Sequence, residues 1–330
     1  MATDVRLADW TFISGAIAVA ETRLLSDDEF LDLLRLPSLE ALLGRIKQVE
    51  TYVHLAPPES PDDAAATLER EFINIVRRVE QDAPDAAVCE LMLVNTLFAE
   101  LRSFVRERLA DEEPGEQSSG FFADGALEAL WNDSFEARPD LRETVSKLRT
   151  TLEKSEDAAA IADLLLDREE IVRFLSLARS VGSEFADDWS ALAARLHAAL
   201  VVIRARLAGT DVERLTDMFL GPPLDDEWLL ALAAEDLERL DGVLAQGFTP
   251  PEGETPEVSR AAVGKLSRMM DDRLTLEMTP ARMIAFGPER LLGYLWGLHI
   301  ENLNLRLIAE TLVVEGDRDE TRARLRRSYV

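Results

Sequence analysis

The chain has 330 residues, a formal net charge of −27, one cysteine, and few glycines (16) or prolines (14). This acidic balance excludes a nucleic-acid-binding protein, which needs a basic surface. It favours instead a soluble chain or one with cationic partners. The lone Cys89 excludes an internal disulfide framework and fits a reducing compartment.

The beginning of the chain lacks the features of a targeting segment. Asp4 and Asp9 stand where a secretory signal would have a basic region. The uncharged run from Trp10 to Ala20 is much shorter than the roughly 20 residues that span a bilayer. We therefore expect a soluble, cytoplasmic chain.

Helical signals then follow one another along the whole chain, and no run alternates apolar and polar residues as a strand does. Ser26 and Glu29 form a capping box ahead of a short amphipathic helix. Pro37-Ser38 starts a second short helix, and the polar run Asp111 to Gly120 reads as a linker. Helical spacing of apolar residues recurs in the ranges 68–79, 88–109, 141–152, 161–165, 190–207 and 258–272. The sequence predicts an all-α protein.

The chain also repeats itself. Residues 27–42 align with residues 225–240 without a gap, with eight of sixteen positions identical at an offset of 198. A degenerate middle copy begins near Asp124, and Arg106–Leu109 recurs 98 residues later as Arg204–Leu207. Chance similarity between leucine-rich helices is the alternative explanation. We expect three helical lobes of about 100 residues, at 1–115, 116–212 and 213–330, each ending on a long helix.

The last of these long helices spans about Phe286 to Leu312. Gly287-Pro288 is a helix start signal. Gly293 and Gly297 are four residues apart, so they open a groove on one face where another backbone could approach. Glu301 and Asn304 continue the same line among apolar neighbours. A packing groove with a structural hydrogen-bond network is the simplest interpretation, because buried polar groups need partners.

The residues of this helix resemble a known family. The string Glu301-x-x-Asn304-Leu305-Arg306, preceded by Phe286-Gly287-Pro288-Glu289, resembles the C-terminal signature of the C-type subunit of bacterial and archaeal V/A-type rotary ATPases, the counterpart of the d-type subunit of vacuolar ATPases. Residues 15–25 are similar to the family's opening. Ala16 and Ala18 stand there in place of arginines, and Asn302 in place of an aliphatic residue.

The resemblance implies a fold and a role. Members of the family consist of three similar helical lobes in a pseudo-threefold funnel. Such a protein is a non-catalytic part of the central stalk (the rotor), on the cytoplasmic face of the membrane. It links the central shaft to the proteolipid ring and transmits torque for ion transport coupled to ATP hydrolysis or synthesis. Its membrane association is through the ring alone.

Motifs for catalysis are absent from the sequence. It has no P-loop, GxGxxG, GxSxG, HExxH or CxxC string, and His54, His197 and His299 lie far apart. We therefore expect no catalytic centre, cofactor or metal. Adjacent aspartates could hold Mg²⁺ and a diphosphate, as in helical prenyl-transfer enzymes, but among the five adjacent pairs only Asp27-Asp28 is followed at the required spacing, by Asp32 four residues after Asp28. Helix starts explain such pairs better.

Basic residues gather at the end of the chain. Ion pairs within the chain on a solvated last helix are the simpler interpretation, and docking onto an acidic neighbour is the alternative. The residues are Arg318, Arg322, Arg324, Arg326 and Arg327. The rival to the ATPase hypothesis is a helical adaptor or scaffold, which would stack shorter repeats into an open solenoid.

Overall fold

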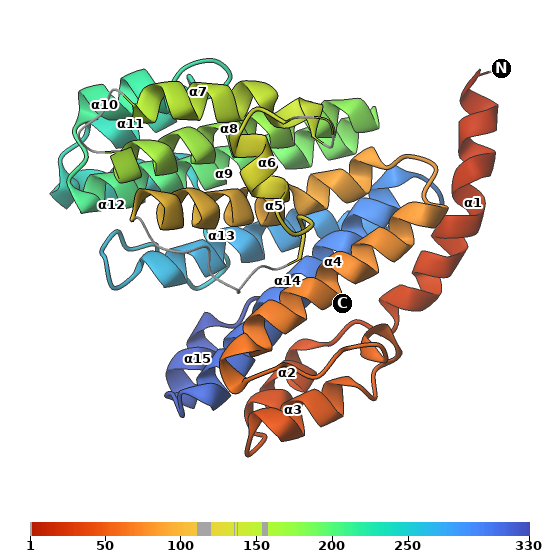
Figure 1. The fold of residues 1–330 in the computed structure, drawn as a ribbon. Helices are drawn as coiled ribbons and strands as arrows, with labels where there is room; N and C mark the ends of the chain where they lie inside the picture. The colour runs from red at the N-terminus through yellow and green to blue at the C-terminus, as the bar shows by residue number, and fades with distance from the viewer. Residues whose placement is uncertain (1, 111–119, 135, 137, 154–157) are drawn as a thin grey trace.

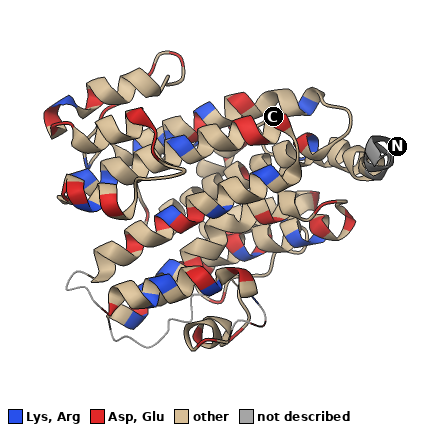
Figure 2. Cartoon of the chain, turned by 90° about the horizontal axis from the view of Figure 1, so that it is seen from above, with Lys and Arg blue, Asp and Glu red and all other residues tan. Residues whose placement is uncertain are grey.

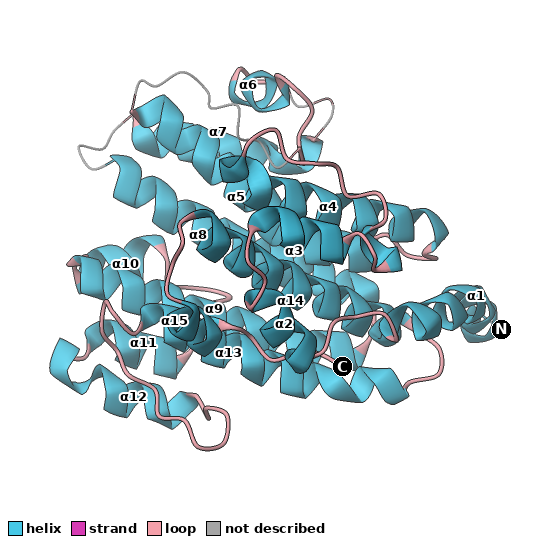
Figure 3. Cartoon of the chain, turned by 90° about the horizontal axis from the view of Figure 1, so that it is seen from below, coloured by secondary structure: helices cyan, strands magenta, loops and turns pink. Residues whose placement is uncertain are grey.

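The computed structural model describes residues 2–110, 120–134, 136, 138–153 and 158–330, with only the backbone described for residues 2–9 (Figure 1). These ranges hold fifteen α-helices, five short 3₁₀ helices and no strand (Figure 3). The all-α prediction is therefore confirmed. Most of the predicted linker, residues 111–119, lies outside the described residues.

The helices follow the chain in three groups. The first group is α1 (Ala2–Glu21), α2 (Asp27–Leu34), α3 (Leu39–Ile46), η1 (Glu50–Tyr52), η2 (Pro61–Asp63), α4 (Ala64–Asp82) and α5 (Ala87–Leu109). The second is α6 (Ala126–Trp131), η3 (Pro139–Leu141), α7 (Arg142–Leu152), α8 (Ala158–Val181) and α9 (Glu184–Ala208). The third is α10 (Val212–Met218), α11 (Glu227–Ala234), η4 (Leu237–Arg239), α12 (Leu240–Gly247), α13 (Val263–Met278), η5 (Thr279–Met283), α14 (Pro288–Val313) and α15 (Arg318–Arg324).

Side-chain caps fix several helix starts. The predicted capping box at Ser26 is present at the start of α2, and Ser38 caps α3 by accepting from the backbone N–H of Ala41. Asp226 caps α11 in the third copy, at the position that corresponds to Asp28 and not to Ser26. Ser183 caps α9 and starts it at Glu184, earlier than the predicted residue 190. Such caps satisfy backbone donors that have no partner within the helix.

Helix α14 is the spine of the molecule. It runs beside α4 and also packs against α1, α5, α9 and α13 (Figure 1). Helices α5, α8 and α9 form a neighbouring layer, and a second, smaller apolar core lies among α5, α6, α7 and α8. Helix α1 projects at one end of the molecule, and α10, α11 and α12 lie at the other (Figures 1 and 3).

The three long closing helices of the predicted lobes exist as α5, α9 and α14. The contacts, however, cross the predicted boundaries. Helix α4 contacts α14 more extensively than it contacts α5, and α5 has its most extensive contact with α8. The division at 1–115, 116–212 and 213–330 and the funnel arrangement therefore stay predictions.

Candidate functional site

The first turn of α14 is fixed to α9. Gly287 has a φ of +135°, a region that favours glycine, and places Pro288 at the first helical position. The Glu289 carboxylate accepts a hydrogen bond of 2.6 Å from the Ser183 hydroxyl, which also caps α9. The start of α14 is thus held both by backbone conformation and by a contact from a distant helix.

The glycine groove of α14 is filled by a side chain. A Cβ atom on Gly293 would lie 2.3 Å from the Tyr329 hydroxyl and 2.9 Å from the Ala281 Cβ. A Cβ on Gly297 would lie 2.8 Å from Leu24 Cδ1 and 2.9 Å from Tyr329 Cδ1. The sequence predicted the close approach of another backbone there, but the groove instead holds the tyrosine ring of the C-terminal end.

Asn304 holds the same C-terminal segment, residues 325–330, which we call the C-terminal strap. Its amide nitrogen donates to the carbonyl of Arg326, and its amide oxygen accepts from the backbone N–H of Arg326, both at 2.9 Å. Asn304 is completely buried, so these two bonds satisfy a group that would otherwise be costly.

The strap also joins elements from both ends of the chain. The backbone N–H of Arg327 donates to Asp272 of α13 at 2.6 Å. The Ser328 hydroxyl donates to the carbonyl of Leu25 at 2.6 Å, and its backbone N–H donates to Asp27 at 2.7 Å. The strap therefore links α13, α14 and the turn between α1 and α2.

Glu301 faces that same turn. Its Oε2 atom accepts a 2.6 Å hydrogen bond from the backbone N–H of Leu25, and its Oε1 atom is buried with no hydrogen-bond partner among the described residues. Burial raises the pKa of Glu301 from 4.5 to about 7, although the backbone N–H of Leu25 and the Tyr52 hydroxyl act to lower this pKa. Glu301 therefore joins the spine to the N-terminal segment and titrates near neutral pH.

Arg306 belongs to a separate polar cluster on α4. Its guanidinium donates to Glu69 at 2.7 Å, and Asn302 and Thr96 donate to the same carboxylate at 2.6 and 2.7 Å. Burial alone would raise the pKa of Glu69, but Arg306, Thr96 and Asn302 outweigh it, so this pKa is lowered. Asn302, where the family usually has an aliphatic residue, thus has a specific partner.

We expect Arg306→Ala to lower the free energy of unfolding by about 1–2 kcal/mol, because Glu69 would lose its charged partner at a largely buried position. Urea unfolding measures this. Arg35→Ala is the control, since Arg35 and Asp32 form an ion pair with side chains 74% and 73% exposed. Its effect should stay below about 0.5 kcal/mol. Equal effects of the two variants would contradict the assignment.

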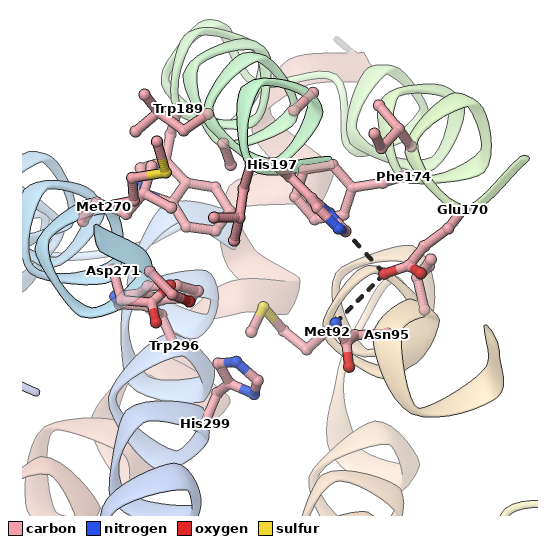
Figure 4. Close-up of a pocket in the computed structure, with 18 of the residues that line it drawn as sticks. Met92, Asn95, Glu170, Phe174, Trp189, His197, Met270, Asp271, Trp296 and His299 are labelled. Atoms are coloured by element: carbon pink, nitrogen blue, oxygen red, sulfur yellow. Dashed lines mark hydrogen bonds and ion pairs between the residues drawn. The ribbon is translucent and has the colours of Figure 1, made fainter. Parts of the chain in front are cut away.

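A cavity of about 270 Å³ lies among α5, α8, α9, α13 and α14 (Figure 4). Apolar and aromatic side chains line most of it, with several polar groups between them. The labelled lining residues are Met92, Asn95, Glu170, Phe174, Trp189, His197, Met270, Asp271, Trp296 and His299. Burial lowers the pKa of His299, with Asp271 and Glu69 opposing.

Beside this cavity, Asp167, Glu170 and His197 bring possible metal ligands within 4.8 Å of one another, which the sequence spacing did not indicate. Arg102 lies between the two carboxylates and donates to Asp167 at 2.5 Å and Glu170 at 3.1 Å. Burial raises the pKa of Glu170 despite Arg102 and His197. A guanidinium already supplies the positive charge, so we interpret the cluster as an ion-pair network.

The comparison with protein families identifies the family of the chain. A family model described as the ATP synthase (C/AC39) subunit matches residues 13–324. The chain belongs to this family. A search of curated proteins gave no match. The resemblance inferred from residues 286–312 is thereby confirmed, and the chain is a C/AC39-type subunit of a V/A-type ATPase whose partners are other subunits of that complex.

Two further findings bear on this C/AC39 subunit. In the part of the chain that the structure describes, no helix is long and apolar enough to cross a membrane.

The pair Asp271 and Asp272 lies inside α13 and not at a helix start. The carboxylates of both residues bind the C-terminal strap instead. Here the interpretation of paired aspartates as helix starts is wrong.

The C-terminal arginines divide into two groups. Arg326 forms a 2.7 Å ion pair with Asp271, and Arg318 donates to the carbonyls of Arg35 and Leu36. The other three have exposed side chains and no ion pair within the described residues. They are Arg322, Arg324 and Arg327.

The α1 end of the molecule carries exposed apolar side chains that were not predicted from the sequence. Phe12 is 75% exposed and Val19 54%, and these residues lie two helical turns apart on α1. Met283 and Phe286, before α14, are 87% and 50% exposed. A 2.6 Å ion pair between Glu21 and Arg290 fixes the end of α1 to α14. The apolar run from Trp10 to Ala20 was the available signal.

Proposed function

We propose that this chain is a non-catalytic central-stalk subunit that links the central shaft of a V/A-type ATPase to its proteolipid ring. It transmits torque for ion transport coupled to ATP hydrolysis or synthesis, on the cytoplasmic face of the membrane. The observation that carries the proposal is the family match over residues 13–324. This role needs stiffness and contact area and no reactive side chain.

The contacts of α14 support a stiff linking element. The helix is held at its start by Ser183, along its middle by Tyr329 and the Glu301 contact, and beyond by the strap bonds to Asn304. These contacts come from α9, the C-terminal end and the α1–α2 turn. A load applied to one end of the spine is therefore shared among segments far apart in the sequence.

The exposed apolar surface of α1 supports a contact with another subunit. Large exposed apolar side chains that gather in one place mark interaction sites. We assign Phe12 and Val19, with Met283 and Phe286 of the η5–α14 segment, to the contact with the proteolipid ring.

The double variant Phe12→Ser/Val19→Ser tests the ring contact. We expect its affinity for the detergent-solubilised proteolipid ring to fall at least tenfold, since two exposed apolar contacts are removed. Thermal unfolding should stay unchanged, because both side chains are exposed. Val53→Ser, at another 55% exposed position, is the matched control. Unchanged ring affinity would contradict this contact, and an unmodified chain that binds neither ring nor shaft would indicate an adaptor unrelated to the rotor.

A further inference from the structure

The outer face of α11 and η4 is an exposed apolar strip. Leu230 and Leu237 are 39% and 49% exposed. Ala231 and Ala234 are also exposed, and with Leu230 they follow helical spacing on one side of α11. This α11 strip lies at the end of the molecule opposite α1 (Figure 1).

The repeat within the chain shows that the helical motif does not require a leucine at position 230. At the offset of 198 residues, Leu230 of α11 corresponds to Asp32 of α2. Asp32 is exposed and pairs with Arg35 at the end of the same helix. The same helical motif thus carries a charged residue at this position in one copy and a leucine in the other.

The two copies also differ in what covers them. Helix α2 contacts α14 and α15, and Arg318 of α15 donates to the carbonyls of Arg35 and Leu36 at the end of α2. Helix α11 packs on α9, α10 and α12. At the end of α11, Arg206 of α9 donates to the carbonyl of Glu235 at 3.1 Å, so this end is bound by α9 and not by a C-terminal helix such as α15.

The surroundings of the strip are strongly acidic. Residues 211–257 contain thirteen acidic and two basic side chains, a net charge of −11 out of −27 for the whole chain. Acidic residues occur along many of the helices (Figure 2). Those beside the strip are exposed or half-buried, and four of them have no ion pair within the described residues. These four are Asp225, Glu227, Asp236 and Glu238.

From these observations we infer that the α11 strip is the docking site for a basic amphipathic helix of another subunit of the ATPase. The aliphatic side of that helix covers Leu230 and Leu237. Its Lys or Arg side chains pair with the surrounding carboxylates. The identity of the partner as an ATPase subunit rests on the proposed function. A second copy of the chain is a poorer occupant, because each copy carries a charge of −27.

Photo-crosslinking in the intact complex tests the inference. A photoreactive residue is placed at position 230, and the ATPase is purified from membranes, irradiated and analysed by mass spectrometry. We expect a cross-linked peptide from another subunit, with aliphatic residues at helical spacing flanked by Lys or Arg. A cross-link to a second copy, to an acidic peptide or to no protein would overturn the inference. If the chain does not co-purify with ATPase subunits at all, the proposed function fails instead.

A binding measurement gives the contribution of Leu230 to the affinity for the partner subunit. Leu230→Asp installs the residue that the first copy carries at this position, so the chain should still fold. We expect its dissociation constant for the chain-depleted complex to rise at least tenfold, and 0.5 M salt to weaken binding of the unmodified chain. Val314→Asp, at a 73% exposed position, is the control and should bind normally. Equal binding by Leu230→Asp, or binding that is insensitive to salt, would refute the inferred docking site.

Discussion

Gly293→Ala should destabilise the protein by about 2 kcal/mol, although alanine is the better helix former. In an open helix, the change from glycine to alanine stabilises by about 1 kcal/mol. At Gly293 the new Cβ would lie 2.3 Å from the Tyr329 hydroxyl and 2.9 Å from the Ala281 Cβ. Overpacking of this kind costs typically 1–3 kcal/mol or more, so the expected sign is reversed. Urea unfolding measures the free energy, and hydrogen exchange of residues 325–330 reports release of the strap.

The control for Gly293 is Gly44→Ala in α3, where an added Cβ would have no atom within 4 Å. That variant should be stabilised by about 1 kcal/mol. Adding Tyr329→Ala to Gly293→Ala should recover part of the exchange protection lost elsewhere in α14, because one of the two close contacts is removed. A stabilised Gly293→Ala variant would show that the tyrosine does not occupy the groove in solution.

The second large effect is the dependence of the free energy of unfolding on pH that Glu301 causes. The pKa of its carboxyl is raised by burial to about 7, whereas an exposed carboxyl of this kind titrates at 4.5. Below about pH 4.5 the carboxyl group is protonated in both the folded and the unfolded state, so it contributes nothing to the pH dependence of stability. Between about 4.5 and 7 the unfolded chain releases the proton and the folded chain retains it, so stability falls as pH rises. The total loss is about 3 kcal/mol and is complete above about pH 7.

Glu301→Gln removes this titration while retaining an acceptor for the backbone N–H of Leu25. At pH 8 we expect the variant to be more stable than the unmodified chain by up to about 3 kcal/mol, and at pH 4 to differ by less than about 1 kcal/mol. Urea unfolding at several pH values measures both differences. Burial also raises the pKa of Asp272, to about 6. This group titrates in both proteins, so its contribution cancels in the difference between their stabilities.

Glu40→Gln, at an exposed position of α3, is the matched control and should change stability by less than about 0.5 kcal/mol at either pH. If Glu301→Gln were instead less stable at pH 8, the hydrogen bonds to the carboxylate would outweigh its burial, and the neutral-pH titration assigned to Glu301 would be wrong.

Local signals in the sequence predicted the helices and the family well. The starts of α2, α3 and α11 are capped by the side chains of Ser26, Ser38 and Asp226. The sequence therefore indicates these starts locally, without knowledge of distant contacts. The line of Gly293, Gly297, Glu301 and Asn304 was also visible, because a helix face follows from spacing alone.

The partners of that line were not predictable in the same way. Nothing near residue 293 indicates that Tyr329 fills the groove, and nothing near Asn304 indicates the backbone of Arg326. These contacts depend on the path of the strap across α13 and α14. Asp271 and Asp272 illustrate the same difficulty, since paired aspartates suit a helix start equally well until a distant segment is seen to bind them.

The exposed surfaces were missed for a related reason. An apolar residue on a helix predicts burial, and only the packed fold shows that Phe12 and Leu230 remain outside the core. Once the fold is known, the difference between Leu230 and Asp32 becomes informative, because it separates what the helical motif needs from what one copy alone presents.

Rotation of this chain within the working ATPase is the most direct test of its proposed role as a rotor subunit. Cys89 is buried, and burial raises its pKa to about 12, so it should resist labelling. Lys47→Cys at the exposed end of α3 then offers one site for a bead, with the catalytic part of the complex immobilised. We predict that the bead rotates steadily when ATP is added and stops when ATP is removed. A bead that stays still while the same complexes hydrolyse ATP would contradict a rotor subunit.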